Sequence, residues 1–327
     1  MGQAAAARAL HREAVVVDAH CDTLMDLVAG RRRLGQRGPG GHVDLPRLRE
    51  GGVSVQFFAH YIEPHYKPDR ALRRFLELHD AFLREADANA NSMAVVTSWS
   101  ELEQALADGR LAAVVSIEGG EAIAGSLEVL RALHRLGVRA IGLTWNERND
   151  IADGVGEAHS PGGLTRFGRQ VVAEMNRLGM LVDVSHLSEP SFWDVLEVSS
   201  RPVIASHSNA RAVCDHVRNL TDEQIRALSV NGGVMGLNFC PPFVHPHRAD
   251  VERVVDHALH VLDLVGPDHL GLGSDFDGIQ ETPAGLEDVT RLPRLTETLL
   301  RRGVDEDSVC KILGGNFLRV FRQVWEA

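Results

Sequence analysis

The sequence predicts an α/β fold of the (β/α)8 or TIM barrel type, in a single domain that spans residues 1–327. Short apolar runs that end in polar residues recur along the chain, and helix-like segments separate them, as expected for alternating strands and helices. In addition, 44% of the residues are hydrophobic, which is enough to build one large core. No linker and no repeat beyond the strand–helix unit divides the chain.

Eight apolar runs are the expected strands, and they are apolar or β-branched throughout, as in parallel strands buried on both faces. They cover residues 14–20, 53–60, 112–119, 138–145, 180–186, 202–208, 233–239 and 269–277. Between them, the leucines of "SLEVLRALHRLG" follow a helical period. In "TDEQIRALSVNGG", Thr221 is an N-cap with Gln224 three residues later. The glycine- and arginine-rich stretch 29–52 is expected to be a long loop with a short helix at the mouth of the site.

An open doubly wound sheet is the alternative architecture. The first strand–helix turn, "HCDTLMDL", lacks the GxGxxG pattern that such a sheet uses to hold a phosphate. We therefore favour the closed barrel.

The composition excludes several classes of partner. The formal net charge of -11 argues against binding to nucleic acid or to an anionic membrane surface, because both would repel the chain. No apolar run approaches the roughly 20 residues that span a bilayer, and the start of the chain lacks the apolar core of a secretory signal. The four cysteines show no CxxC spacing, so reduced thiols in a cytoplasmic protein are expected.

Six ionisable residues lie at or just after the ends of the expected strands, where barrel enzymes keep their active sites. They are His20 and Asp22 of the first strand, Glu118 of the third, His186 of the fifth, His207 of the sixth and Asp275 of the eighth. Any one of them could simply cap the following turn. Six at the same level would be costly to bury unless they share a cation, and this favours a metal site.

The ligand types and their spacing indicate zinc. His20 and Asp22 are two residues apart, so both side chains can project to the same side of a strand. Neutral imidazole and carboxylate suit Zn²⁺. Five candidate ligands exceed what one tetrahedral ion with an open position uses, so we expect two zinc ions per chain bridged by Glu118. The first ion would take His20, Asp22 and Glu118, and the second Glu118, His186 and His207.

Three further carboxylates have expected roles near this site. Asp275 can take a proton from water and pass it to a leaving group. Asp277, two residues later, is expected to orient the loop. Asp18 either accepts a hydrogen bond from the second nitrogen of a ligand histidine or is a buried carboxylate bound to backbone amides, and the sequence leaves both open.

In this order, the stretches "VVDAHCDTL", "SIEGGE", "VDVSHLS", "PVIASHSNARAVCDHVRNLTDEQI" and "LGLGSDFDGI" resemble the membrane (renal) dipeptidase family of zinc peptidases, peptidase family M19, in its bacterial soluble form. The resemblance covers nearly the whole chain. It implies an amidohydrolase-like barrel with two zinc ions that cleaves dipeptides, often with a D-residue at the C-terminal position. Carried over by position, it implies the same five metal ligands, Glu118 as the bridge and Asp275 as the proton-transferring group. It also implies that Arg218, in "HVRNL", grips the C-terminal carboxylate of the substrate, a role that suits a guanidinium fork.

One position departs from the mammalian-type members, which carry a histidine after "LT" at the end of the fourth strand. Here the text is "LTWN", so Trp145 and Asn146 follow. Contact with the substrate carbonyl is therefore expected from the indole, from Asn146 or from the metals alone. A homodimer is expected by analogy with the family.

The first hypothesis is a dipeptidase acting on L,L and L,D dipeptides, in which a hydroxide bridging the metals attacks the peptide carbonyl. The second keeps the metal-dependent barrel and changes the substrate to another amide, a lactam or a phosphoester. The third is a barrel that only binds a small molecule or a partner and keeps the metal site as a relic. Loss of activity on removing Arg218 would favour the first, because the substrates of the second carry no carboxylate for it to grip.

Overall fold

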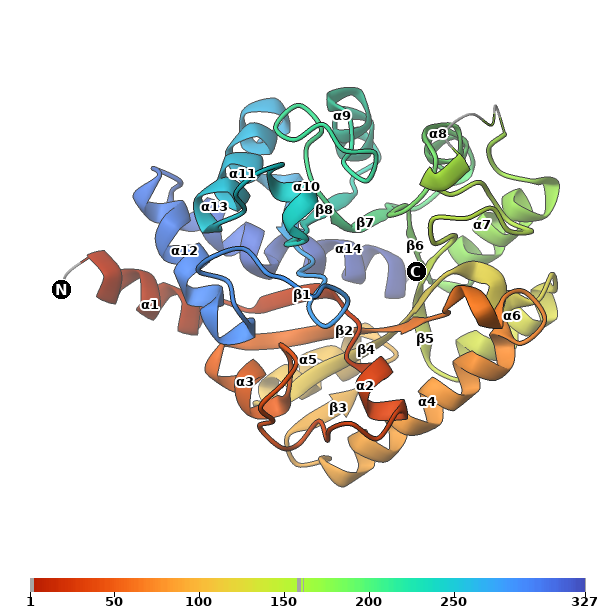
Figure 1. Cartoon of the computed structure of the whole chain (residues 1–327), viewed down its shortest axis with the longest axis horizontal. Coiled ribbons are helices and arrows are strands. Elements are labelled where there is room, and N and C mark those ends of the chain that lie inside the picture. Colours follow the sequence, from red (N-terminus) through yellow and green to blue (C-terminus); the bar gives the residue numbers. More distant parts are fainter. Residues whose placement is uncertain (1–2, 158–159, 161, 327) are drawn as a thin grey trace.

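Eight parallel strands close into a barrel in the computed structural model, which describes residues 3–157, 160 and 162–326. The strands are β1 (Val16–Cys21), β2 (Val53–Tyr61), β3 (Met93–Val95), β4 (Leu111–Glu118), β5 (Val138–Gly142), β6 (Leu181–Asp183), β7 (Ile204–Ser208), β8 (Val234–Leu237) and β9 (Leu270–Leu272). Their order is β2-β1-β9-β8-β7-β6-β5-β4, and pairing of β2 with β4 closes the ring. The predicted (β/α)8 barrel is confirmed, with helices around the strands (Figure 1).

The helices follow the strands along the chain. They are α1 (Gln3–Glu13), α2 (Leu24–Val28), α3 (Leu45–Glu50), α4 (Ala71–Ala88), α5 (Trp99–Ala107), α6 (Leu127–Arg135), α7 (Arg166–Leu178), α8 (Glu189–Val198), α9 (Asp222–Val230), α10 (Pro241–Val244), α11 (Val251–Val265), α12 (Leu292–Arg301), α13 (Glu306–Cys310) and α14 (Asn316–Trp325). The capping box expected at α9 is present, because Thr221 accepts from the Gln224 amide and Gln224 accepts from the Thr221 amide. No helix in the described part of the chain is long and apolar enough to cross a bilayer.

The ninth strand, β3, was not among the expected eight. It pairs with Leu111–Ala113 of β4, while β5 pairs along residues 115–118 of β4, so β3 extends the sheet beside the ring. Its three residues lie next to "VTSWS" and form too short an apolar run to stand out from sequence.

The interior of the barrel below the strand ends is filled by apolar side chains. Ala112 and Val114 lie on the same face of β4 as Glu118, because alternate residues of a strand share a face. They belong to one buried cluster with Phe57 of β2 and with Phe317 and Phe321 of α14. The helix α14 therefore packs against the barrel interior on the side away from the strand ends, and Figure 1 shows it lying across the strands.

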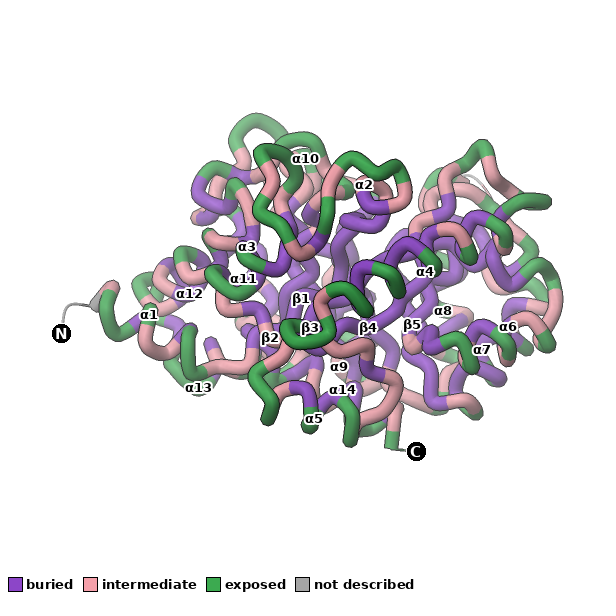
Figure 2. The backbone as a smooth tube through the Cα atoms, turned by 90° about the horizontal axis from the view of Figure 1, so that it is seen from below, coloured by how far each residue is buried: buried purple, intermediate pink, exposed green. Residues whose placement is uncertain are grey.

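A second buried cluster lies between the barrel and its surrounding helices, as where Phe58 of β2 packs on Phe82 of α4. Figure 2 shows the buried residues along the strands and the inner faces of the helices, with exposed residues on the outer helices and loops. The two clusters make the barrel a rigid support for the residues at its strand ends.

The first strand is less regular than predicted. Its pairing with β2 shifts register between Asp18 and Cys21. Ala19 packs in the interior cluster, yet the next residue, His20, already lies among the polar residues of the site. Plain alternation would send these two side chains to opposite faces, so the irregularity helps to bring His20 into the site.

Candidate metal centre and active site

The five residues predicted to bind metal lie together at the carboxyl ends of four strands, and all are buried. His20 lies in β1, Asp22 directly after it, Glu118 ends β4, His186 follows β6, and His207 lies in β7. Their donor atoms form groups in which every pair of atoms lies within 4.8 Å. Two of these groups are His20–Asp22–Glu118 and Glu118–His186–His207, the two sets expected from the sequence.

In the first group, the atoms that could bind a metal lie close together without forming hydrogen bonds to one another. His20 Nε2 lies 3.3 Å from Asp22 Oδ2 and 3.4 Å from Glu118 Oε2. Neither His20 Nε2 nor Asp22 Oδ1 has a hydrogen-bond partner among the described residues. Buried polar atoms are normally satisfied, so these two suit a cation between them.

In the second group, the lone pairs of two imidazole nitrogens and one carboxylate oxygen point toward one another. His186 Nε2 lies 2.9 Å from His207 Nε2 and 2.9 Å from Glu118 Oε1. His186 Nδ1 lies 2.8 Å from the side-chain oxygen Oδ1 of Asn146, so Nδ1 carries the proton and Nε2 has the lone pair. The Ser206 hydroxyl donates to Asp183 at 2.5 Å and therefore accepts from His207 Nδ1 at 2.7 Å.

It follows that both Nε2 atoms are acceptors and that both face a carboxylate oxygen. Three electron-rich atoms at this separation repel each other unless a cation lies between them. These atoms fit a metal ion held by imidazole and carboxylate, with an amide oxygen and a hydroxyl as the hydrogen-bond partners of the two imidazole Nδ1 atoms.

The electrostatics of the site agree with this reading. Burial lowers the pKa of His186 to about 3, and burial lowers the pKa of His207 well below its usual value, so both imidazoles are neutral, as metal binding requires. Burial, together with the charge of Glu118, raises the pKa of Asp22 to about 7. Burial opposes the charge on His20, but the carboxylates of Glu118 and Asp22 outweigh it and raise the His20 pKa. Crowded buried carboxylates are a common feature of metal and active sites.

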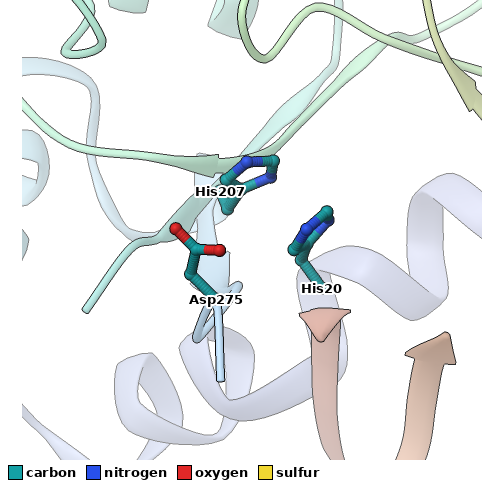
Figure 3. A group of neighbouring side chains, drawn as sticks. All are labelled: His20, His207 and Asp275. Atoms are coloured by element: carbon teal, nitrogen blue, oxygen red, sulfur yellow. The ribbon is translucent and has the colours of Figure 1, made fainter. Parts of the chain in front are cut away.

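Asp275 lies at the same site, within reach of two candidate ligands. It forms a third group with His20 and His207, and Figure 3 shows these three side chains pointing toward one another from β1, β7 and the segment after β9. The Asn238 side-chain amide donates to Asp275 Oδ2 at 3.0 Å. Burial raises the pKa of Asp275, with His20 acting in the opposite direction.

The backbone at these positions is strained. His186, Asp275 and Asp277 are three of the four non-glycine residues with positive φ in the described chain, at 68°, 64° and 68°. Such conformations cost of order 1–3 kcal/mol each and persist where surrounding contacts fix them. Their concentration at two strand ends marks this edge of the barrel as the functional one.

Arg218, the residue expected to grip a carboxylate, is buried beside this group. One of its Nη atoms donates to the carbonyl oxygen of His207 at 3.2 Å, while its Nε has no partner in the described part of the chain. Burial lowers its pKa, and the carboxylates of Asp275 and Glu118 act in the opposite direction. A buried guanidinium with a free donor is suited to bind an anion.

Trp145 and Asn146 both lie beside His186. The Trp145 and His186 ring centroids are 6.1 Å apart, and Asn146 accepts the His186 Nδ1 proton. Asn146 is thus engaged with a candidate ligand, whereas the Trp145 indole packs against Tyr61 at 5.3 Å.

Asp18 does not contact a ligand imidazole. It accepts from the Ser274 amide at 2.8 Å and from the Ser274 hydroxyl at 2.6 Å. Of the two roles left open by the sequence, the contacts match a buried carboxylate bound to backbone amide and hydroxyl. It ties β1 to the segment that carries Asp275.

Sequence reasoning missed Asn238, Asp183 and Ser206, which orient other residues of the site, and it expected Asn146 only as a contact to the substrate. Asn238 holds Asp275, Asp183 and Ser206 fix the tautomer of His207, and Asn146 fixes that of His186. Their shared signal is a polar residue within or just after a buried apolar strand, as with Asp183 in β6 and Ser206 in β7. Ser208, another buried hydroxyl at the end of β7, has no hydrogen-bond partner in the described chain.

Comparison with known proteins agrees with the geometry. The family model described as membrane dipeptidase (peptidase family M19) matches residues 4–327. The dipeptidase tcpJ of Claviceps purpurea (strain 20.1) is 39% identical over 295 residues, which are 87% of this chain and 69% of the relative.

Two solved structures are similar over almost their full lengths. A crystal structure described as the dipeptidase AC, a metallopeptidase of family M19, has a TM-score of 0.90 and 35% identity, covering 96% of this chain and 99% of the other. A metallopeptidase from Rhodobacter sphaeroides, liganded with a phosphinate mimic of the dipeptide L-Ala-D-Ala, has a TM-score of 0.89 and 33% identity, covering 96% and 100%. These matches confirm the resemblance read from the sequence, and the chain belongs to the membrane dipeptidase family, peptidase family M19.

Proposed function

We propose that this protein hydrolyses dipeptides, of both L,L and L,D configuration, with two zinc ions bridged by Glu118. The observation that carries the proposal is the convergence of possible metal-ligand atoms from five buried residues, His20, Asp22, Glu118, His186 and His207. Two of these atoms, His20 Nε2 and Asp22 Oδ1, have no hydrogen-bond partner among the described residues. The first ion would be held by His20, Asp22 and Glu118, and the second by Glu118, His186 and His207. When bound, the ions supply Lewis acidity that polarises the peptide carbonyl and lowers the pKa of water.

The residues of the chain supply binding and proton transfer. Arg218 binds the C-terminal carboxylate of the dipeptide through its free donor and so fixes the peptide bond relative to the ligands. Asp275 accepts the proton of the attacking water and returns it to the leaving amine. The Asn238 amide occupies one oxygen of Asp275 and leaves the other for this proton.

In this proposal Trp145 and Asn146 lie near the amino-terminal residue of the bound dipeptide. Asn146 orients His186 through its Nδ1 proton. The indole N–H of Trp145 is a donor for the substrate carbonyl, in place of the histidine of mammalian-type members. A neutral amide or lactam substrate is less favoured, because it has no anionic group to pair with the buried Arg218 guanidinium.

The test combines metal analysis with a substrate panel. We expect about two zinc ions per purified chain, and amine release from Ala-Ala dipeptides of L,L and L,D configuration that stops on chelation and returns with added zinc. Full activity in metal-free protein, or hydrolysis of phosphoesters but no dipeptide, would contradict the proposal. A cytoplasmic location and a homodimer stay predictions.

A further inference from the structure

A cavity of about 490 Å³ opens beside the candidate metal centre and leads outward between the segments after β6 and β7. Its inner end is formed by His186, Ser208 and Arg218, and its outer rim includes Trp193 and Val217. Its volume lies within the roughly 300–1,000 Å³ of small-molecule sites. The cavity thus connects the proposed chemistry to solvent on one side of the barrel mouth.

The inner end of the cavity carries two unsatisfied buried polar atoms. Arg218 is 5% exposed and Ser208 is 1% exposed. Arg218 Nε and Ser208 Oγ have no hydrogen-bond partner among the described residues. One guanidinium donor and one hydroxyl at the same end suit the two oxygens of a carboxylate.

The wall beyond this end is mainly apolar. It is lined by Val155, Val184, Leu187, Pro190, Trp193 and Leu220. Six large apolar side chains of the described residues are strongly exposed, and two of them, Trp193 at 38% and Val217 at 56%, lie on this cavity. Trp193 packs edge-on against the fully buried Phe192, so its position is fixed while part of the indole stays open to a ligand. Exposed apolar groups at a cavity rim indicate contact with an apolar ligand.

The charges on the cavity disfavour an acidic occupant of the outer part. Glu157 and Glu189 line it. The Arg211 guanidinium, also on the wall, is held by the carbonyl oxygens of Asn219 and Val217. The outer wall thus carries two carboxylates and one guanidinium, which already donates to two backbone carbonyl oxygens.

We propose that this cavity receives the side chain of the C-terminal residue and makes the enzyme prefer dipeptides whose C-terminal residue is bulky and apolar. The inference rests on the proposed dipeptidase function. A carboxylate held by Arg218 and Ser208 places the adjacent Cα at the inner end of the cavity. The side chain on that Cα then has the apolar wall and the Trp193 indole beside it.

The first experiment compares kcat/KM of the zinc-loaded enzyme on Ala-Gly, Ala-Ala, Ala-Leu, Ala-Phe and Ala-Asp, which share one amino-terminal residue. Each buried methylene group is worth about fourfold in an equilibrium constant. We therefore expect Ala-Leu and Ala-Phe to exceed both Ala-Gly and Ala-Asp by tenfold or more. Equal values for Ala-Gly and Ala-Phe, with both hydrolysed, would overturn the inference and leave the dipeptidase function intact.

Variants on the rim test the surface directly. Trp193→Ala and Val217→Asp should each lower the ratio of kcat/KM for Ala-Phe to that for Ala-Gly about five- to tenfold. A ratio is used because an unfolded fraction lowers both values equally. The matched control is Val230→Asp, at an 89% exposed valine at the end of α9 that does not line the cavity, which should keep the wild-type ratio.

A binding measurement separates this inference from catalysis. In calorimetric titrations of metal-free protein, N-acetyl-phenylalanine should bind about tenfold more tightly than N-acetylglycine, and Trp193→Ala should abolish the difference. Equal binding of the two acids would overturn the inference. If no dipeptide were hydrolysed by the zinc-loaded enzyme, the proposed function would fail, and the binding difference would still report on the cavity.

Discussion

One carboxylate oxygen of Asp275 accepts a hydrogen bond from a side chain, and among the described residues the other does not. The Asn238 amide donates to Oδ2, the Asp275 backbone amide donates to the carbonyl oxygen of His20, and burial raises the pKa of the side chain. These contacts fix its position without using the oxygen that would carry the proton. This position is compatible with the role in proton transfer that we propose for it.

Replacing Asp275 by Asn keeps the shape of this side chain and removes its basicity. We expect Asp275→Asn to lower kcat about 10²- to 10⁴-fold, the usual contribution of a general acid–base group, with KM and zinc content nearly unchanged. Steady-state kinetics and metal analysis of the same preparation check this. Loss of zinc in step with activity would instead assign Asp275 a role as a ligand.

The Arg218 guanidinium is buried, and its Nε donor has no partner among the described residues. A substrate carboxylate would supply that partner. Arg218→Ala should lower kcat/KM for dipeptides about 30- to 4,000-fold, because truncating one partner of a buried charge pair costs about 2–5 kcal/mol. The internal control is a dipeptide amide, which lacks the carboxylate and should be hydrolysed slowly and equally by both enzymes. Equal losses on both substrates would show that Arg218 serves the fold and not the substrate.

At the scale of elements, the long loop between α2 and α3 is tied to the segment that carries Asp275. The Asp277 carboxylate accepts from Thr23 at 2.7 Å, from Arg32 at 2.5 Å and from the His42 amide at 2.5 Å. Its own amide donates to His42 Nδ1 at 2.9 Å. These four bonds hold a segment with two positive φ angles, at Asp275 and Asp277, so they fix the backbone that carries the Asp275 carboxylate.

Asp277→Asn removes the charge that Arg32 pairs with and one acceptor oxygen. We expect kcat to fall about tenfold, the cost of losing roughly 1.4 kcal/mol of positioning, with zinc content retained and KM little changed. The matched control is Asp26→Asn, because Asp26 also binds Arg32, at 2.6 Å, but does not bond to Asp277. Similar kinetics for the two variants would remove the special role of Asp277.

Features encoded by short local stretches of sequence were predicted, and features that depend on long-range contacts were not. The strands and the residues at their ends, such as Glu118 and His207, are local signals, because a buried strand and its terminal side chain are read from one short run. The strand β3, the register shift in β1 and the partners of Asp277 depend on contacts between residues far apart in the chain. Hydrophobic periodicity indicates which residues of a segment are buried, but it does not indicate which distant residues they contact. The cavity beside Arg218 was not predicted for the same reason.

At the scale of the whole molecule, the residues of the candidate site and the residues that stabilise the fold lie at different levels of the barrel. The strand ends carry strained backbone and crowded carboxylates, which cost stability. The interior below them is apolar and is packed against α14, where the Phe321 ring stacks on Phe57 at 5.2 Å and on Trp325 at 4.8 Å. The closure by α14 therefore offsets the cost of the site above it.

This division predicts that stability is lost at α14 without a direct effect on the site. Phe321 is fully buried, and Phe321→Ala should lower the free energy of unfolding by about 3–5 kcal/mol, the range for a large aromatic side chain removed from a core. Leu76→Ala, at a 45% exposed position of α4, is the control and should change it by about 0.5 kcal/mol or less. Urea unfolding of the metal-free proteins measures both, because bound zinc would add its own stabilisation.

Zinc content after reloading the folded Phe321→Ala protein should match the wild type. A small loss of stability together with impaired zinc binding would mean that α14 supports the site directly, and that the two levels of the barrel are coupled.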